Sequence, residues 1–550
     1  MSLIQSLVAK PLRYLESTSY IEKNIDEIQE GASQDENYLF YRSGENIKIY
    51  DRTCDHNGGK LSLRGKSASC PLHGWELDLK LGFYINARCH KKPVLEVNEY
   101  ELDSPVISIP KTSKELCVAE FDEEKKTEVR FINHACLLFK LGGVSFATDP
   151  WLVGSAFCNG WWLAKSSPKD AFDEINNCDF IYISHNHPDH LHKESLEHIR
   201  KDMPIVTADF LSGSTKSLLY DYGFSEIVAM DFVTALMDVD KQLFFAVLKS
   251  GDFRDDSGLF FQNGRFKCLL TVDSNFLDFG RFPQVDLLCS SFAGGASGFP
   301  LCFENYTEKD KRVVVSRNCG AIKAANTLNI KGTKATTFMP YAGFFTEKAK
   351  RDSYIKERNI KNCVEDFEKT CAAYDSKLLN VDDKQRFLFK GSELVSEEVD
   401  ECEKMLASEV DECIAKMHFN KNLELSDKVL KYFEGCEFKD NLIVDLIATN
   451  DDFSDYYDRF CLDFTSNTYS KVDVNLDVDS IENDALSSQS RYLQIKVRRS
   501  ELFDVITEGK PWEELSIGFQ CRIYRQPNIY NSEFWFYFTN RYIGSAAAIV

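Results

Sequence analysis

Two short pairs of cysteine and histidine near the amino terminus have the residue types and spacing of a metal centre. The first pair is Cys54 and His56, and the second pair, which follows after 13 residues, is Cys70 and His73. Two thiolates and two imidazoles at this spacing fit a [2Fe–2S] cluster in which histidine replaces cysteine on one iron. Neutral ligands on that iron raise the reduction potential above that of an all-cysteine cluster. The sequence therefore predicts a chain that accepts and passes on single electrons.

The alternative for these four residues is structural zinc, since cysteine and histidine pairs also hold that metal. Common zinc sites pair Cys with Cys and His with His, whereas here each pair is a Cys followed by a His. Glycines beside both pairs, such as Gly58 and Gly74, suit two tight loops that pack over a cluster. The run 70–82 resembles the second cluster loop of Rieske ferredoxins and oxygenases. This resemblance implies a Rieske domain.

A second group of ligands follows the apolar run 180–183, which reads as a buried strand. Three histidines and one aspartate occur within six residues: His185, His187, Asp189 and His190. A tight loop at the carboxyl end of a strand can turn all four side chains into one cleft. The spacing is the H-x-H-x-D-H signature of the metallo-β-lactamase superfamily. This resemblance implies that the first two histidines serve one metal position and the last two residues another, with Asp273 where the family places a bridging aspartate.

The ligand set departs from that superfamily, because no histidine lies between His198 and His418. A complete dinuclear site of the usual type is therefore not predicted. His134 fits a buried core histidine as well as a role near the metal. Three acids offer oxygen ligands, although a solvated turn is the favoured interpretation: Asp252, Asp255 and Asp256. A mixed histidine and carboxylate site with open positions suits non-haem iron, as one or two ions, better than structural zinc.

Bulk properties indicate a folded multidomain protein. The 550 residues exceed what one core holds, and 43% apolar and 13% aromatic residues are typical of globular domains. The formal net charge of −21 argues against a surface for nucleic acid or anionic membrane. The 18 cysteines are scattered, no signal-peptide pattern opens the chain, and no apolar run has the length of a membrane span. We expect a cytoplasmic protein with reduced cysteines.

The pattern of strands and helices predicts an α+β multidomain fold with three regions. Residues 1–115 read as a small all-β domain around the cluster loops, with short strands broken by glycine turns. Residues 125–347 alternate strand-like and helical runs, as in the αβ/βα sandwich of metallo-β-lactamases. Residues 348–550 read first as helical and charged, with a helix over 397–417, and then as β-rich. This C-terminal α/β region has no predicted fold.

The two motifs in one chain resemble the CMP-N-acetylneuraminate hydroxylase family. The segments that carry the resemblance are 149–157, 160–163, 182–185, 292–300, 340–345 and, more loosely, 510–515. The resemblance implies a monooxygenase that uses O2 and two electrons to hydroxylate the N-acetyl group of a CMP-sialic acid. It also implies an external electron donor, cytochrome b5 or a ferredoxin with its NAD(P)H reductase, because the chain has no flavin or dinucleotide motif of its own. Cluster and iron together make sense, since O2 activation consumes electrons delivered one at a time.

A glycine-rich turn offers a place for the phosphate of such a sugar nucleotide. Gly294, Gly295 and Ser297 could present backbone N–H groups to it, whereas the alternative is a plain turn. Two other functions stay open. One is an oxygenase acting on a different sugar nucleotide, amide or amine, and the other is an electron-transfer protein with a degenerate second site. A zinc phosphodiesterase would have no use for the cluster.

Overall fold

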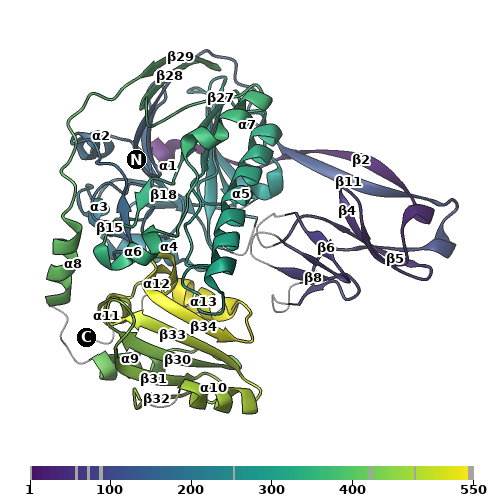
Figure 1. The fold of residues 1–550 in the computed structure, drawn as a ribbon. Helices are drawn as coiled ribbons and strands as arrows, with labels where there is room; N and C mark the ends of the chain where they lie inside the picture. Colours follow the sequence, from purple (N-terminus) through teal and green to yellow (C-terminus); the bar gives the residue numbers. More distant parts are fainter. Residues whose placement is uncertain are drawn as a thin grey trace.

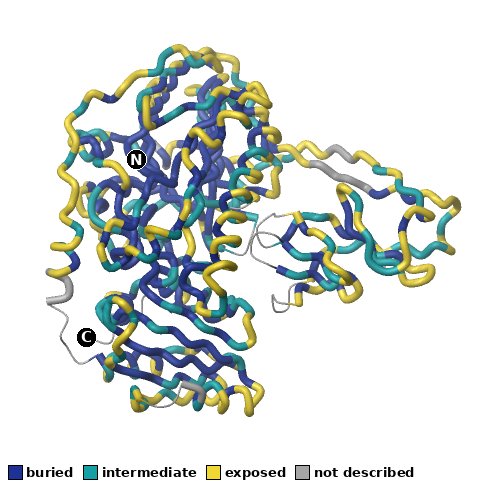
Figure 2. Tube along the Cα trace, in the orientation of Figure 1, coloured by how far each residue is buried: buried dark blue, intermediate teal, exposed yellow. Residues whose placement is uncertain are grey.

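The computed structural model describes residues 3–55, 60–70, 75–85, 91–251, 254–274, 276–419, 425–475 and 478–542. Its centre is a sandwich of two eight-stranded sheets with helices outside them (Figure 1). A small β-domain and a C-terminal α/β domain are attached to this sandwich (Figure 1). Figure 2 shows that burial is concentrated in the sandwich sheets and in the sheet of the C-terminal domain. The predicted α+β multidomain fold class is confirmed.

The first sheet of the sandwich has the strand order β1-β20-β21-β22-β23-β24-β25-β27. Its strands are β1 (Val8–Pro11), β20 (Thr234–Asp238), β21 (Leu243–Lys249), β22 (Ser257–Asn263), β23 (Phe266–Leu270), β24 (Leu287–Ser291), β25 (Thr337–Tyr341) and β27 (Lys377–Leu378). Strands β23, β24, β25 and β27 run parallel. Parallel neighbours need a crossover, which the long helix α5 (Glu308–Thr333) provides between β24 and β25. Neither α5 nor any other helix in the described part of the chain is long and apolar enough to cross a membrane.

The second sheet has the order β19-β18-β17-β14-β13-β12-β28-β29. Its strands are β19 (Ile227–Met230), β18 (Ile205–Ala208), β17 (Phe180–Ile183), β14 (Ser145–Thr148), β13 (Cys136–Lys140), β12 (Lys126–Asn133), β28 (Arg386–Lys390) and β29 (Glu393–Glu398). The outer face packs against α2 (Ala171–Asn176), α3 (Lys193–Glu197) and α4 (Ser214–Asp221). The inner face meets the first sheet in an aromatic core, where Phe146 contacts Phe180, Phe245 and Phe261.

Local sequence and structure agree best in the parallel strands of the second sheet. Strands β17 and β18 have the bounds predicted from their apolar runs, because parallel strands are covered on both faces. The predicted helix over 397–417 is wrong in its first half. Residues up to Glu398 pair as β29 with β28, and α8 (Val410–Phe419) begins only afterwards. Strands β1 and β27 to β29, which lie outside the predicted range 125–347, also pair in the sandwich.

The small β-domain extends from the sandwich on a long two-stranded ribbon (Figure 1). Strands β2 (Tyr14–Asn24) and β11 (Val106–Leu116) form this ribbon by antiparallel pairing along their whole length. One four-stranded sheet contains β10 (Leu95–Asn98), β5 (Asn46–Asp51), β4 (Tyr38–Ser43) and β3 (Gly31–Gln34). The other contains β6 (Ser62–Arg64), β7 (Ser67–Ser69), β8 (Glu76–Asp78) and β9 (Phe83–Tyr84). The domain thus has the all-β character that its glycine-broken strands predict.

The C-terminal domain is built on a five-stranded sheet of order β32-β31-β30-β33-β34. The strands are β32 (Thr468–Val472), β31 (Tyr456–Asp463), β30 (Leu442–Thr449), β33 (Arg491–Arg498) and β34 (Cys521–Gln526). Its helices include α9 (Leu425–Glu434), α10 (Val478–Ser487), α11 (Arg499–Glu508), α12 (Glu513–Ile517), α13 (Ser532–Phe536) and a final π-helical turn (Tyr537–Arg541). One apolar cluster joins Phe433 and Trp512 of this domain to Trp151, Phe157 and Trp161 of the sandwich. The domain therefore shares a continuous core with the loop 151–163.

Glycines allow this loop and α12 to touch through their backbones. A Cβ on Gly160 would lie 2.0 Å from the carbonyl oxygen of Gly518, and one on Gly518 would lie 1.9 Å from that of Phe157. The indole Nε1 of Trp161 donates a hydrogen bond to the carbonyl oxygen of Ile517 at 3.1 Å. No side chain larger than hydrogen fits at either glycine without moving a backbone. The segment 160–163 thus contacts residues 517–518, and Trp161 shares one apolar cluster with Trp512 and Leu515 of the segment 510–515.

A buried ion pair at the same interface is expected to stabilise the docking of the C-terminal domain. Glu501 Oε1 lies 2.8 Å from Arg351 Nη2, and its Oε2 accepts a hydrogen bond from Asn159 Nδ2 at 3.2 Å. Replacement of Glu501 by alanine leaves a buried guanidinium short of its main partner, so we expect the unfolding free energy to fall by about 3 kcal/mol. Chemical unfolding followed by tryptophan fluorescence, to which the buried Trp512 contributes, measures this loss.

The control is an exposed ion pair that crosses the same interface. Glu304 Oε2 lies 2.9 Å from Lys496 Nζ, and Glu304 is exposed. Because solvent screens exposed pairs, the change of Glu304 to alanine should cost about 1 kcal/mol or less. Equal losses in the two variants would show that the burial of Glu501 does not matter.

Candidate metal centres

The predicted ligands of the second centre gather at one edge of the sandwich. The loop 184–190 follows β17, and Asp149 directly follows β14, its parallel neighbour in the second sheet. Asp273 follows β23 in the facing sheet, and His134 lies at the turn between β12 and β13. Ligand sites of α/β sheets form at the carboxyl ends of strands. Strand order therefore brings together side chains that are far apart in the sequence.

Two sets of three ligand atoms lie close enough to share a cation. His134, Asp189 and His190 offer atoms within 4.8 Å of one another, and so do His185, His190 and Asp273. Asp189 Oδ2 lies 3.1 Å from His134 Nε2 and 3.3 Å from His190 Nε2. Asp273 Oδ2 lies 3.4 Å from the same His190 atom. His190 Nε2 thus faces a carboxylate of each set.

His187 lies beside the two sets and completes the signature. Its Nδ1 is 2.8 Å from His185 Nε2, and its ring packs against Phe157 with centroids 5.6 Å apart. The structure therefore brings all four signature residues into one cluster with Asp273. Their roles as ligands remain a prediction.

Asp149 and Ser184 fix the orientation of two of the histidines. Asp149 Oδ2 lies 3.0 Å from His190 Nδ1 and accepts a hydrogen bond from the Ser184 hydroxyl at 2.8 Å. The same hydroxyl lies 2.9 Å from His185 Nδ1. A carboxylate on one ring nitrogen of a histidine leaves the other nitrogen for a metal. The sequence places Asp149 in a segment that resembles the family but assigns it no role. Its position directly after an apolar strand is the feature of the sequence that could have marked it as a site residue.

The charges around His190 favour a cation. Burial lowers the pKa of His190, but the carboxylates of Asp189, Asp273 and Asp149 outweigh burial and raise that pKa well above its usual value. Burial raises the pKa of Asp189, yet the imidazoles of His190 and His134 hold it well below its usual range. Buried carboxylates that favour a protonated histidine also favour another positive charge. A metal ion can therefore take the place of this proton.

His185 and His187 have the opposite electrostatics. Burial lowers the pKa of His185 well below its usual value, and the neighbouring His190 and His187 lower it further. Burial also lowers the pKa of His187, to about 4. Both imidazoles are therefore neutral at physiological pH, which is the form that binds metals.

Two buried carboxylate oxygens of the cluster have no hydrogen-bond partner in the described part of the chain. They are Asp189 Oδ1 and Asp273 Oδ1. Buried polar atoms are usually paired, since an unsatisfied one costs about 1–3 kcal/mol. A metal ion bound here satisfies such atoms, so the donors present fit a mixed histidine and carboxylate iron site. His187 and Asp273 are partly exposed, and the cluster opens on their side.

Two residues that the sequence left open join the cluster. His134 is 1% exposed, has a positive φ of 41°, and adds a further imidazole to the group of Asp189 and His190. Asp256 is buried, and its Oδ1 lies 3.5 Å from His185 Nδ1. The interpretation as a solvated turn is therefore wrong for Asp256. Asp255 is partly exposed, and Asp252 lies outside the described residues.

The first centre has its two cysteines in the core of the small β-domain. Cys54 and Cys70 are each 1% exposed, form no disulfide and pack in the same apolar cluster. The backbone N–H of Cys70 donates to the carbonyl oxygen of Trp75 at 2.7 Å. Two buried thiols in one small core fit the cysteine side of an iron–sulfur cluster. His56 and His73 lie outside the described residues.

Lys92 and Tyr84 hold the first cluster loop. Lys92, which is 1% exposed, donates from Nζ to the Thr53 carbonyl at 2.6 Å and to Asp55 Oδ1 at 2.8 Å. The Tyr84 hydroxyl accepts the Asp55 N–H at 3.1 Å. Burial and the nearby thiol of Cys54 raise the pKa of Tyr84, so its hydroxyl stays protonated. Hydrogen bonds to cluster sulfurs tune the reduction potential, and Tyr84 is placed to supply one.

Packing explains the glycines that were predicted to bind substrate. Gly294 and Gly295 have φ values of 72° and 73°, a region that favours glycine. A Cβ on Gly295 would lie 2.6 Å from Asn359 Oδ1. Ser297 is exposed, and its hydroxyl accepts the Phe299 N–H at 3.1 Å. A contact with phosphate remains a prediction for these residues.

A buried neutral histidine next to the signature loop makes stability depend on pH. His192 Nδ1 and Nε2 lie 2.9 Å from Ser195 Oγ and from the Ser155 carbonyl oxygen, and burial lowers its pKa from 6.5 to about 4. Between these values the unfolded chain binds more protons, so stability falls as pH drops. We expect His192 to make the unfolding free energy about 2 kcal/mol lower at about pH 5 than at about pH 7.5.

The pH dependence is checked with His192→Gln, whose amide can keep both hydrogen bonds. Unfolding curves of this variant should lose that part of the pH slope. His198→Gln, at the exposed end of the same helix, should keep the slope. An unchanged slope in His192→Gln would contradict the prediction.

Family comparisons match the two regions of the chain that contain the candidate metal centres. Residues 18–103 match the family description "Rieske [2Fe-2S] domain", and residues 128–244 match "Beta-lactamase superfamily domain". The fold and the site thus define a Rieske protein with a second, metallo-β-lactamase-like centre, and its first domain carries a [2Fe–2S] cluster.

Relatives cover almost the whole chain. The cytidine monophosphate-N-acetylneuraminic acid hydroxylase of Mus musculus is 30% identical over 91% of this chain and 90% of its own length. The protein of the same name from Xenopus laevis is 28% identical over 91% of this chain and 88% of its own. The chain belongs to the cytidine monophosphate-N-acetylneuraminic acid hydroxylase family.

Solved structures match parts of the chain. The isothiocyanate hydrolase from Delia radicum gut bacteria has 16% identity and a TM-score of 0.34, over 48% of this chain and 99% of its own. CmlA, a diiron beta-hydroxylase from Streptomyces venezuelae, has 14% identity and a TM-score of 0.34, over 63% of this chain and 69% of its own.

Proposed function

We propose that this chain is a Rieske-dependent non-haem iron monooxygenase that hydroxylates the N-acetyl group of CMP-N-acetylneuraminate. Membership of the hydroxylase family over nine-tenths of the chain carries this proposal. The reaction consumes O2, two electrons and two protons. One oxygen atom enters a C–H bond of the methyl group to give the N-glycolyl product, and the other leaves as water.

The two centres have separate tasks in this proposal. Iron bound at the second centre would supply a site for O2, and the [2Fe–2S] cluster would supply electrons one at a time. The signature residues, with His134 and Asp273, would hold the iron. Asp149 keeps His190 Nε2 turned towards it through the 3.0 Å contact with Nδ1. The partly exposed side near His187 and Asp273 is where the substrate's methyl group enters.

The electrons come from a separate protein. Cytochrome b5, or a ferredoxin, with its NAD(P)H reductase suits this role because the chain has no flavin or dinucleotide motif. We place the enzyme in the cytoplasm, which is a reducing compartment that contains such electron donors. None of the 17 cysteines in the described part of the chain forms a disulfide, which supports a reducing compartment.

Incubation with CMP-N-acetylneuraminate, NADH, cytochrome b5 and its reductase tests the proposal. The expected product is heavier by one oxygen atom, and with ¹⁸O₂ that atom should carry the label. Reactions without reductant or without O2 are the controls and should give no product. No product from any acylated sugar nucleotide, or turnover without reductant together with bound zinc, would contradict it.

A further inference from the structure

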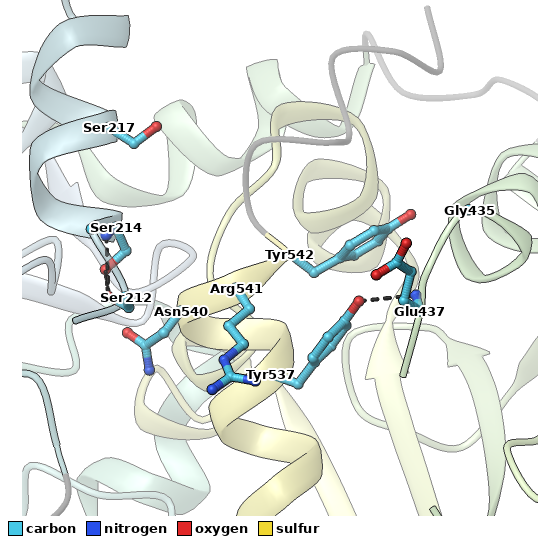
Figure 3. Close-up of a pocket in the computed structure, with 10 residues that line it drawn as sticks. Ser212, Ser214, Ser217, Gly435, Glu437, Tyr537, Asn540, Arg541 and Tyr542 are labelled. Carbon is cyan, nitrogen blue, oxygen red and sulfur yellow. Dashed lines mark hydrogen bonds between the residues drawn. The ribbon is translucent and has the colours of Figure 1, made fainter. Parts of the chain in front are cut away.

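A polar pocket lies between the sandwich and the C-terminal domain. Its volume is about 400 Å³, within the range of small-molecule sites (Figure 3). One wall is the start of α4, and the opposite wall combines the turn after α9 with the final π-helical turn. Domain interfaces are common places for ligand sites. The lining has two chemically different ends.

One end suits a phosphate. Ser212, Ser214 and Ser217 place hydroxyl groups at the start of α4, and the guanidinium of Arg541 lies across from them (Figure 3). Arg541 is exposed and forms no ion pair with a carboxylate in the described part of the chain, although the protein carries a net charge of −21. An unpaired arginine with hydroxyl groups and a helix start provides charge-assisted hydrogen bonds to an anion.

The other end suits a base with an amino group. The rings of Tyr537 and Tyr542 stack with centroids 5.8 Å apart, and the Tyr537 hydroxyl accepts the backbone N–H of Glu437 at 2.9 Å (Figure 3). The Tyr542 hydroxyl donates to the Tyr432 carbonyl at 2.7 Å, so this wall is fixed. Aromatic faces stack on bases, and a carboxylate accepts from the N4 amino group of cytosine. Uracil has no such donor.

The pocket is joined to the second metal centre by one side chain. Asn186 lies between His185 and His187 in the signature and is 5% exposed. Its Nδ2 donates to Ser214 Oγ at 3.2 Å and lies 3.4 Å from Asn540 Oδ1, and both partners line the pocket. The phosphate end of the pocket is therefore the end that contacts the metal loop.

We infer that this pocket binds the cytidine monophosphate part of the substrate. The order of groups in the substrate is base, ribose, phosphate, sugar. The protein groups follow the same order. The tyrosines and Glu437 lie at the base, the serines and Arg541 lie at the phosphate, and Asn186 leads from there to the metal centre. This inference rests on the proposed function for the identity of the substrate, and it assigns the nucleotide to residues outside the turn 294–297. The C-terminal domain thereby becomes the part of the chain that recognises the nucleotide.

Calorimetric titration of the full-length, cluster-containing protein with CMP and with UMP tests the inference without turnover. Arg541→Gln should weaken the binding of CMP by about tenfold or more, because a charge-assisted contact to phosphate is lost. Glu437→Gln should reduce the preference for CMP over UMP by about tenfold. Arg317→Gln, an exposed arginine on α5, is the matched control and should bind CMP as the wild type does.

The outcomes separate this inference from the proposed function. CMP that fails to bind, or binds equally to the wild type, Arg541→Gln and Glu437→Gln, overturns the assignment of the pocket. Turnover of CMP-N-acetylneuraminate with an unchanged KM in both variants also overturns it, while the proposed function stands. If CMP binds with the expected sensitivities but no hydroxylated product forms, the pocket assignment stands and the proposed function fails.

Discussion

Replacement of Asp189 by alanine is expected to abolish hydroxylation and to leave the visible spectrum of the iron–sulfur cluster unchanged. Asp189 Oδ2 faces both His134 Nε2 and His190 Nε2, at 3.1 and 3.3 Å, and no other carboxylate in the described residues does so. Mutation of a residue that only orients a metal ligand lowers metal affinity or activity by about 10- to 100-fold. Loss of a ligand itself should therefore reduce turnover by at least about 100-fold. Iron per chain should fall to the two irons of the cluster.

Asp179 provides the control for Asp189. It precedes β17 at the opposite edge of the sheet, where its Oδ2 accepts the Ser145 N–H at 2.7 Å. Asp179→Ala should lose some stability but keep its second-site iron and its turnover. If Asp189→Ala kept more than about a tenth of the turnover, the residue would not be a ligand. Loss of the cluster spectrum in that variant would show that the two centres do not fold independently.

Local sequence was sufficient for the parts of the molecule that are built locally. Strand β17 is an uninterrupted apolar run, and the four signature residues follow within the next seven residues, so the strand and the place of the candidate ligands could be predicted together. The same holds for Cys54 and Cys70, whose burial in one core agrees with their spacing. The family comparison supports the resemblance that these motifs carry.

The rest depends on contacts between segments that are distant in the chain. His134 reaches Asp189 only because β12 and β17 lie in one sheet, and its sequence neighbours carry no ligand pattern. Asp256 reads as part of a polar turn until β22 brings it against His185. The residues around Glu397 favour a helix by composition, but pairing with β28 makes them a strand. The fold of the C-terminal domain rests on pairings of this kind.

Replacement of Cys70 by serine is expected to remove the iron–sulfur cluster and to reduce turnover by at least about 100-fold, because Cys70 is one of the two predicted cysteine ligands of the cluster. Cys70 packs in the core of the small β-domain with Cys54, whereas the second centre belongs to the edge of the sandwich. The visible absorption and the reduced-state electron paramagnetic resonance signal should disappear. The iron of the second centre should remain, because none of its candidate ligands lies in the β-domain.

Cys117→Ser is the control for this variant, because Cys117 is an exposed thiol just beyond β11 and outside the cluster core. It should keep the spectrum, the iron and the turnover. Together with Asp189→Ala, the variant Cys70→Ser gives two proteins that each lose a different centre and the same activity. That result is expected if electrons pass from the cluster to the second centre, because both centres are then needed for turnover. Turnover by a Cys70→Ser protein that has lost its spectrum would mean that electrons reach the iron by another route, and the cluster would not be the relay.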